Sequence, residues 1–118
     1  MVFGDRNVPR VRRHLKDGEV LVSSVAGVEA DGRRRRLVVV TDRRICISWF
    51  RGGPPVEFGL EGAEAEFDPT GRLLTVRQGD EEVMLRDVDE MAARALVELL
   101  SCYRHRSPRP APVLERGA

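Results

Sequence analysis

The sequence contains no apolar run that approaches the roughly 20 residues a helix needs to cross a membrane. It also lacks common signatures of catalysis: there is no Gly-x-Ser-x-Gly segment, no His-Glu-x-x-His segment and no glycine-rich loop ahead of a helix. These absences leave hydrolase, zinc-protease and nucleotide-dependent chemistry without support. We therefore predict a protein that is not an enzyme and that uses no cofactor.

Cysteine and histidine are scarce, with two of each in the chain. Cys102 and His105 have the i, i+3 spacing of half a zinc site, and Cys46 is a conceivable third ligand, but no fourth ligand is evident. We therefore expect no metal centre. Because Asp5 and Arg10 precede any apolar region, no targeting segment is expected, and we predict a cytoplasmic protein with two reduced, buried thiols.

Lysine is nearly absent, since only Lys16 among the 20 basic residues is a lysine. This bias is compatible with a GC-rich genome and carries no functional meaning here. The 20 basic residues almost balance the 19 acidic ones, so nucleic acid is not an expected partner. The charges are nevertheless segregated along the chain. Residues 1–51 carry 12 basic and 6 acidic groups, residues 52–98 carry 4 and 12, and residues 99–118 carry 4 and 1.

The strongest structural pattern lies between residues 37 and 49. Two apolar runs, Leu37–Val40 and Ile45–Trp49, flank the polar segment Thr41–Arg44. Short β-branched runs around such a segment predict a β-hairpin. With 118 residues and 42% hydrophobic content the chain has the size of one domain, and we expect this hairpin at the centre of its sheet.

Alternation and turn residues predict about seven strands in all. Besides the central hairpin, strands are expected at 19–28, 56–60, 63–67, 72–78 and 82–86, with Arg33–Arg36 leading from a turn at Asp31-Gly32 into the hairpin. In residues 63–67, small or apolar residues alternate with acidic ones, which predicts a strand with one solvent-exposed face. The fold class predicted is α+β, built on an antiparallel sheet.

Helical spacing appears at both ends of the chain. Val8, Val11 and Leu15 predict a short amphipathic helix after Asn7. A longer helix is expected from Val88. Its predicted inward face consists of Met91, Ala92, Ala95, Leu96, Leu99 and Tyr103. The predicted organisation is an N-terminal extension (1–16), a folded domain (17–104) and a disordered proline-rich tail (105–118).

Two segments carry a resemblance to a known family. The run Asp17-Gly18-Glu19-Val20-Leu21, followed by Leu37–Ile45, resembles the bacterial PH-like domains of the YokE type and the related GRAM-like modules of the pleckstrin-homology (PH) superfold. Those domains open with a helix and a Gly-Glu-hydrophobic segment and carry a hairpin with Thr-Asp-Arg-Arg at its turn. The resemblance implies a strongly bent antiparallel sheet, a β-sandwich that is nearly a barrel, with the final helix capping one end.

The candidate anion or lipid contacts are the arginines near the first hairpin: Arg33, Arg34, Arg35, Arg36 and Arg43. In lipid-binding PH domains this loop holds phosphorylated headgroups, and guanidinium groups suit phosphate because their donors are forked. The alternative is a solvated hairpin, since alternation along a strand sends adjacent arginines to opposite faces.

The candidate partner surface consists of Leu37, Val38, Val39 and Val40. Both faces of this strand are aliphatic, so something other than solvent should cover the outer one. The N-terminal helix, through Val8, Val11 and Leu15, is one candidate, and a second copy of the chain is another, which would make a homo-oligomer.

The turn motif is Thr41, Asp42, Arg43 and Arg44. We interpret it as a structural turn whose arginines pair with acidic neighbours such as Glu64 or Glu66. The function predicted from the sequence is that of a non-catalytic binding or scaffolding module for an unknown protein partner, including self-association. The alternative is peripheral binding to an anionic membrane or polyanion through Arg33–Arg36.

Overall fold

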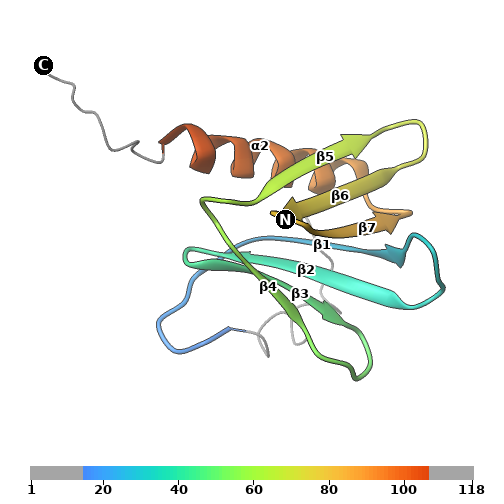
Figure 1. Ribbon diagram of the computed structural model, residues 1–118, viewed down its shortest axis with the longest axis horizontal. Helices are drawn as coiled ribbons and strands as arrows, with labels where there is room; N and C mark the ends of the chain where they lie inside the picture. The colour runs from blue at the N-terminus through green and yellow to red at the C-terminus, as the bar shows by residue number, and fades with distance from the viewer. Residues whose placement is uncertain (1–14, 107–118) are drawn as a thin grey trace, which may run out of the picture.

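The computed structural model describes residues 15–106, with side chains to residue 103. The chain forms seven strands followed by one helix (Figure 1). In order these are β1 (Leu21–Glu29), β2 (Arg35–Thr41), β3 (Arg44–Trp49), β4 (Val56–Gly59), β5 (Glu64–Asp68), β6 (Leu73–Gln78), β7 (Glu81–Arg86) and α2 (Glu90–Arg106). The predicted α+β class and the seven strands are confirmed. The predicted N-terminal helix and proline-rich tail lie largely outside the described residues.

The strands form one antiparallel sheet in the order β4-β3-β2-β1-β7-β6-β5. β1 pairs with β2 along most of its length, but it pairs with β7 only at Val28 and Glu29. The two halves, β1–β4 and β5–β7, therefore join at one end of β1 and splay apart elsewhere, as Figure 1 shows. The sheet is not closed into a barrel, since β4 and β5 are its edge strands. The expected near-barrel is to this extent wrong.

The main core lies between the two halves of the sheet and α2. It is formed by alternate residues of the strands, because side chains two apart share a face. Register places Val38 opposite Ile47 and Val40 opposite Ile45, and all four side chains are fully buried. Leu74, Val76, Val83 and Leu85 close the core from the other half, as their spacing predicts.

A second, smaller apolar cluster lies on the opposite face of β2. Leu37 and Val39 form its centre, and the partly buried Leu15, Leu21, Ala26 and Phe50 pack around them. The aliphatic character of both faces of this strand therefore has a structural reason, because each face belongs to a different cluster. Leu15 takes the covering role predicted for it, whereas Val8 and Val11 lie outside the described residues.

α2 begins where the carboxylate of Asp89 accepts a hydrogen bond from the backbone N–H of Ala92, 2.9 Å away, which is the geometry of an N-cap. Its buried face is formed by Ala92, Ala93, Leu96 and Leu100. The face of α2 that is buried therefore differs by about one residue position from the face that the helical spacing predicts.

Two residues that the spacing predicts on the inward face of α2 are exposed to solvent. Met91 is 77% exposed and Ala95 is exposed, while Leu99 is half-buried. The helix lies along β5 and also contacts β1, so it covers the opening between the two halves of the sheet. Within the described part of the chain, no helix is both long and apolar enough to cross a membrane.

Candidate anion-binding site

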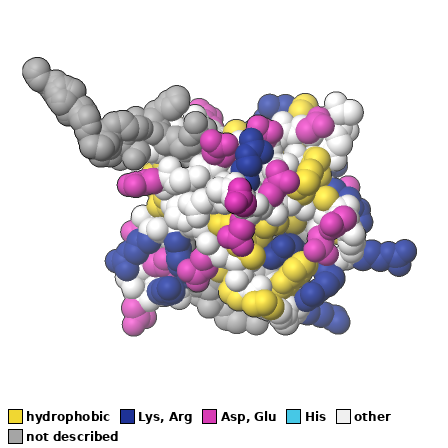
Figure 2. Space-filling view, viewed as in Figure 1, with side chains coloured by type: hydrophobic (Ala, Val, Ile, Leu, Met, Phe, Trp, Pro, Cys, Tyr) yellow, Lys and Arg dark blue, Asp and Glu magenta, His cyan; other side chains and the backbone are white. Residues whose placement is uncertain are grey.

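Two loops at one end of the sheet bring four arginines together. The first connects β1 to β2 and carries Arg33 and Arg34, and the second follows β3 and carries Arg51. Together with Arg35 and Phe50 they line a cavity of about 340 Å³. None of the described residues that line this cavity is acidic, and Figure 2 shows basic side chains projecting from this end of the molecule. We call these five residues the arginine pocket.

Arg34 is held in place by the loop that it faces. Its Nη2 donates to the carbonyl oxygens of Arg51 and Gly52, at 2.6 and 2.9 Å. Its guanidinium also stacks on the ring of Trp49, 4.1 Å from the centroid, an attraction between a cation and the negative face of the ring. Gly53, with φ at +105°, passes so close to Trp49 that a Cβ there would clash with the indole. The two loops and the indole therefore form one ordered unit.

The neighbouring arginines go to opposite faces, as alternation predicts. Arg35 stacks on Phe50 at 4.5 Å and belongs to the arginine pocket. Arg36 points to the other face, where it stacks on Trp49 at 3.7 Å and is only 7% exposed. Burial lowers the pKa of the Arg36 guanidinium. Arg36 is therefore not part of the arginine pocket.

Arg43 is also separate, because it lies in the turn at the other end of β2. There it lines a cavity of about 440 Å³ together with Asp42, Glu61 and Tyr103. The candidate set of five arginines thus divides into three places in the fold: Arg33, Arg34 and Arg35 lie in the arginine pocket, Arg36 at the opposite face and Arg43 at the far turn.

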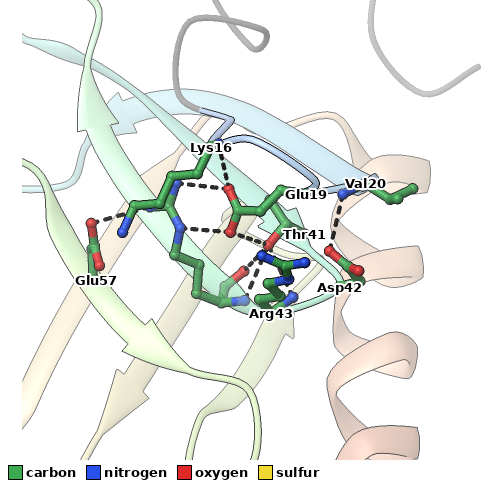
Figure 3. Close-up of polar contacts among 8 residues, drawn as sticks. Lys16, Glu19, Val20, Thr41, Asp42, Arg43 and Glu57 are labelled. Carbon is green, nitrogen blue, oxygen red and sulfur yellow. Dashed lines mark hydrogen bonds and ion pairs between the residues drawn. The ribbon is translucent and has the colours of Figure 1, made fainter.

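The turn motif Thr41–Arg44 connects to the segment before β1, and Figure 3 shows this network. Asp42 binds Val20 twice: its backbone N–H donates to the Val20 carbonyl, and its carboxylate accepts from the Val20 N–H, both at 3.0 Å. The Thr41 hydroxyl accepts from the backbone N–H groups of Arg43 and Arg44 and donates to Glu19. The two sequence segments that carry the family resemblance therefore contact each other.

Glu19 is the centre of this network. Its carboxylate binds Arg44 through two contacts of 2.8 and 3.0 Å, and the exposed fractions of the two side chains are 1% and 12%. Hydrogen bonding to Arg44 lowers the pKa of Glu19 from 4.5 to about 2, against the opposing effect of burial. Arg44 also pairs with Glu57. The carboxylates of Glu64 and Glu66, which were the expected partners, both bind Arg77.

The predicted partner surface is buried within the chain itself. Leu37, Val38, Val39 and Val40 are each at most 1% exposed. A partner at this strand therefore stays a prediction, and it would need the cover over Leu37 and Val39 to be displaced.

Neither cysteine takes part in a described site. Cys46 is buried in β3, while Cys102 on α2 is exposed, contrary to expectation, and both are free thiols. Within the described range no group of three His, Cys, Asp or Glu side chains is placed to hold a metal ion.

Several site residues were missed by sequence reasoning. Local patterns gave no site role to Arg51, Trp49 or Phe50, and they placed Glu19 at the start of a strand. The stacking of arginine on an aromatic ring joins residues about 15 positions apart in the sequence, and it became visible only once the register of β2 against β3 was known. The Gly-Gly-Pro-Pro segment after Arg51 was the available signal of a tight loop.

Comparison of the chain with protein-family models gives no match, and a search of curated proteins likewise finds no match.

Proposed function

We propose that this chain is a non-catalytic, PH-like binding module that holds phosphate-bearing anions in the arginine pocket. The observation that carries the proposal is the pocket itself: its volume is about 340 Å³, and its described lining contains Arg33, Arg34, Arg35 and Arg51 but no carboxylate. Guanidinium groups donate in forked pairs that match phosphate oxygens. Four of them around one cavity favour an anion over any other ligand.

The arrangement of the strands supports the PH-like part of the proposal. Seven antiparallel strands followed by one helix over the opening between the halves of the sheet are the element order that the resemblance implies, although the sheet is open rather than nearly closed. The arginine pocket also lies at the loop where that resemblance places headgroup contacts.

Two sources of phosphate have the same chemistry at this site, namely the headgroups of an anionic membrane and a soluble polyphosphate. Each basic residue near an anionic surface contributes about 1 kcal/mol, so four arginines alone give a dissociation constant on the order of millimolar. We therefore expect weak, salt-dependent binding unless the ligand also contacts Phe50.

The test compares two double variants with the same change in charge. Arg33→Ser with Arg51→Ser removes exposed arginines of the pocket and leaves Arg34, which holds the loop. The matched control, Arg43→Ser with Arg94→Ser, removes two exposed arginines elsewhere. Binding is measured by sedimentation with phosphatidylglycerol vesicles and by the fluorescence of Trp49, the only tryptophan, during titration with tripolyphosphate.

We expect the pocket variant to lose binding about tenfold or more, while the control stays near the native protein. Binding to vesicles alone identifies a membrane ligand, and binding to tripolyphosphate in solution identifies a soluble one. Equal losses in the two variants would show a non-specific charge effect, and the absence of binding to either probe would overturn the proposal. The protein partner that the sequence analysis predicted first would then be the hypothesis to pursue.

A further inference from the structure

A second cavity, of about 300 Å³, lies beside the β1–β2 turn and shares no lining residue with the arginine pocket. Arg36 of β2 and residues of β7 form its walls together with the turn itself. Among the described residues, its charged lining consists of one arginine and three carboxylates, and one of these carboxylates, Glu82, also lies 3.8 Å from Nη1 of Arg77. The described lining residues are Glu29, Ala30, Asp31, Arg36, Glu82, Val83 and Met84.

Arg36 is the unusual member of this lining, because it is a buried cation without an ion pair among the described residues. It is 7% exposed, and its Nη2 reaches only the Ile47 carbonyl oxygen, at 3.5 Å. Its Nε is buried and has no hydrogen-bond partner in the described structure. A guanidinium in such a place is normally paired with a carboxylate or phosphate. One face of the group is occupied by Trp49, so an anionic partner would approach along its edge.

The carboxylates in the same wall restrict what that partner can be. A simple anion would meet Arg36 but would be repelled by Glu29, Asp31 and Glu82, and a simple cation would be repelled by Arg36. A ligand that carries both signs, with the positive charge in excess, satisfies all four groups. The exposed Met84 gives the lining an apolar part, which suits a short aliphatic stem between the two charged ends.

We propose that this cavity binds a basic α-amino acid, lysine or arginine, with its carboxylate on Arg36 and its cationic groups on Glu29, Asp31 and Glu82. The volume falls at the lower end of the range for small-molecule sites, as an amino acid requires. This proposal concerns a different cavity from the arginine pocket, so either can fail without the other.

The experiment titrates the full chain with L-lysine, L-arginine, lysinamide and L-glutamate. Binding is followed by calorimetry and by the emission of Trp49, which stacks directly on Arg36. Lysine or arginine should bind and change the emission. Lysinamide, which lacks the carboxylate, should bind about tenfold more weakly or worse, and glutamate should not bind. Lysinamide binding as tightly as lysine, or no binding of lysine and arginine at millimolar concentration, would overturn the proposal.

Variants locate the site on this cavity. Arg36→Gln should abolish lysine binding, but it alters a buried side chain, so its fold is checked by circular dichroism. Glu82→Gln with Asp31→Asn changes only exposed residues and should weaken lysine binding about tenfold or more while the protein stays folded. Arg51→Ser, in the arginine pocket, should leave lysine binding unchanged. Unchanged lysine binding in the Glu82→Gln, Asp31→Asn variant would contradict the assignment even if Arg36→Gln does not fold.

Discussion

At the scale of single residues, Glu19 is a buried carboxylate held by several hydrogen bonds. It is 99% buried as a side chain, yet its carboxylate accepts two contacts from Arg44 and one from the Thr41 hydroxyl. A buried pair of this kind gains little over a hydrophobic pair, but the loss of one partner leaves an uncompensated charge. Glu19 belongs to one of the two segments that carry the family resemblance. Its contacts connect the segment before β1 to the turn after β2.

Replacing Glu19 by Gln should lower the free energy of unfolding by about 3 kcal/mol, because Arg44 would stay buried without its main counter-charge. The measurement is urea denaturation at neutral pH. Glu57→Gln is the matched control, since Glu57 pairs with the same arginine but its side chain is 48% exposed. Its loss should cost less than about 1 kcal/mol. Equal losses in the two variants would contradict the central role of Glu19.

The pKa of Glu19 also predicts how stability depends on pH. Its folded value of about 2 lies below the ordinary value of 4.5, so the unfolded chain binds the proton more tightly. The stabilisation is therefore complete above about pH 4.5 and is lost as the pH falls from 4.5 toward 2. Denaturation is measured at a series of pH values between 7 and 2. The free energy of unfolding should fall less between pH 4.5 and pH 2 for Glu19→Gln than for the native protein. If the free energy of unfolding falls equally in both proteins, Glu19 is not the group that causes the loss of stability in acid.

At the scale of secondary-structure elements, the short junction between β1 and β7 sets the bend of the sheet. Gly27 of β1 faces the segment that follows β7, and a Cβ at this position would lie 2.7 Å from Cγ1 of Val88 and 3.0 Å from the carbonyl oxygen of Arg86. Both neighbours are fixed, one as a buried side chain and the other as backbone. The close approach of the two halves therefore needs a residue without a side chain here.

Gly27→Ala should consequently destabilise the protein by about 1 to 3 kcal/mol through overpacking. Gly71→Ala is the control, because its added Cβ would meet only an ordinary contact at 4.0 Å with Leu73. Thermal unfolding followed by circular dichroism compares the two. A melting temperature for Gly27→Ala equal to that of Gly71→Ala would mean that the junction can open without cost.

The packing of α2 gives a second prediction at this scale, and it separates the observed helix face from the predicted one. Leu96→Ala should cost about 2 to 5 kcal/mol because it leaves a cavity in the core, whereas Met91→Ala should stay within about 0.5 kcal/mol. Leu96 is fully buried and Met91 is 77% exposed. Chemical denaturation of both variants is the measurement, and a larger loss for Met91→Ala would show that the helix is rotated relative to the arrangement described.

At the scale of the whole molecule, one side chain of β6 links its half of the sheet to the edge strand of the other half. The amide of Gln78, at the end of β6, donates to the carbonyl of Gly59 and accepts from its N–H, at 3.2 and 3.3 Å. Gly59 ends the edge strand β4. A side chain thus makes the two hydrogen bonds that a neighbouring strand would make in a closed barrel.

Gln78→Ala should therefore speed the hydrogen exchange of the Gly59 amide and lower stability by about 1 kcal/mol, since both bonds are exposed to solvent. Gln78→Glu keeps an acceptor for the Gly59 N–H but has no donor for its carbonyl, so its effect on stability should be intermediate. Exchange measured by NMR tests this link, and an unchanged Gly59 rate in the alanine variant would argue against it.

Local patterns were sufficient to predict the strands and most turns. The alternation in 63–67 did predict a strand with acidic residues on one face, because side chains two apart share a face whatever the rest of the fold does. The inward face of α2 was predicted less well. Met91 and Ala95 fit the helical period, but the contact with β5 and β1 rather than the period decided which residues are buried.

The candidate site was only partly predictable for the same reason. Alternation correctly separated Arg35 from Arg36, whereas Arg51 joined the pocket because the register between β2 and β3 brings two distant loops together. Arg77, which was not predicted as a partner, binds Glu64 and Glu66 because it lies on the neighbouring strand β6, directly opposite Glu64. Pairing across strands depends on strand order, which a single sequence does not contain.

The sequence by itself determined the seven strands, the C-terminal helix, the central hairpin and the doubly aliphatic character of Leu37–Val40, since each depends on residues close together in the chain. Only the tertiary structure decided that the sheet stays open, that both faces of this strand are buried within one chain, and that the arginines of the first turn divide between two cavities. These features depend on which strands are neighbours, and strand order follows from the packing of the whole core rather than from any local pattern.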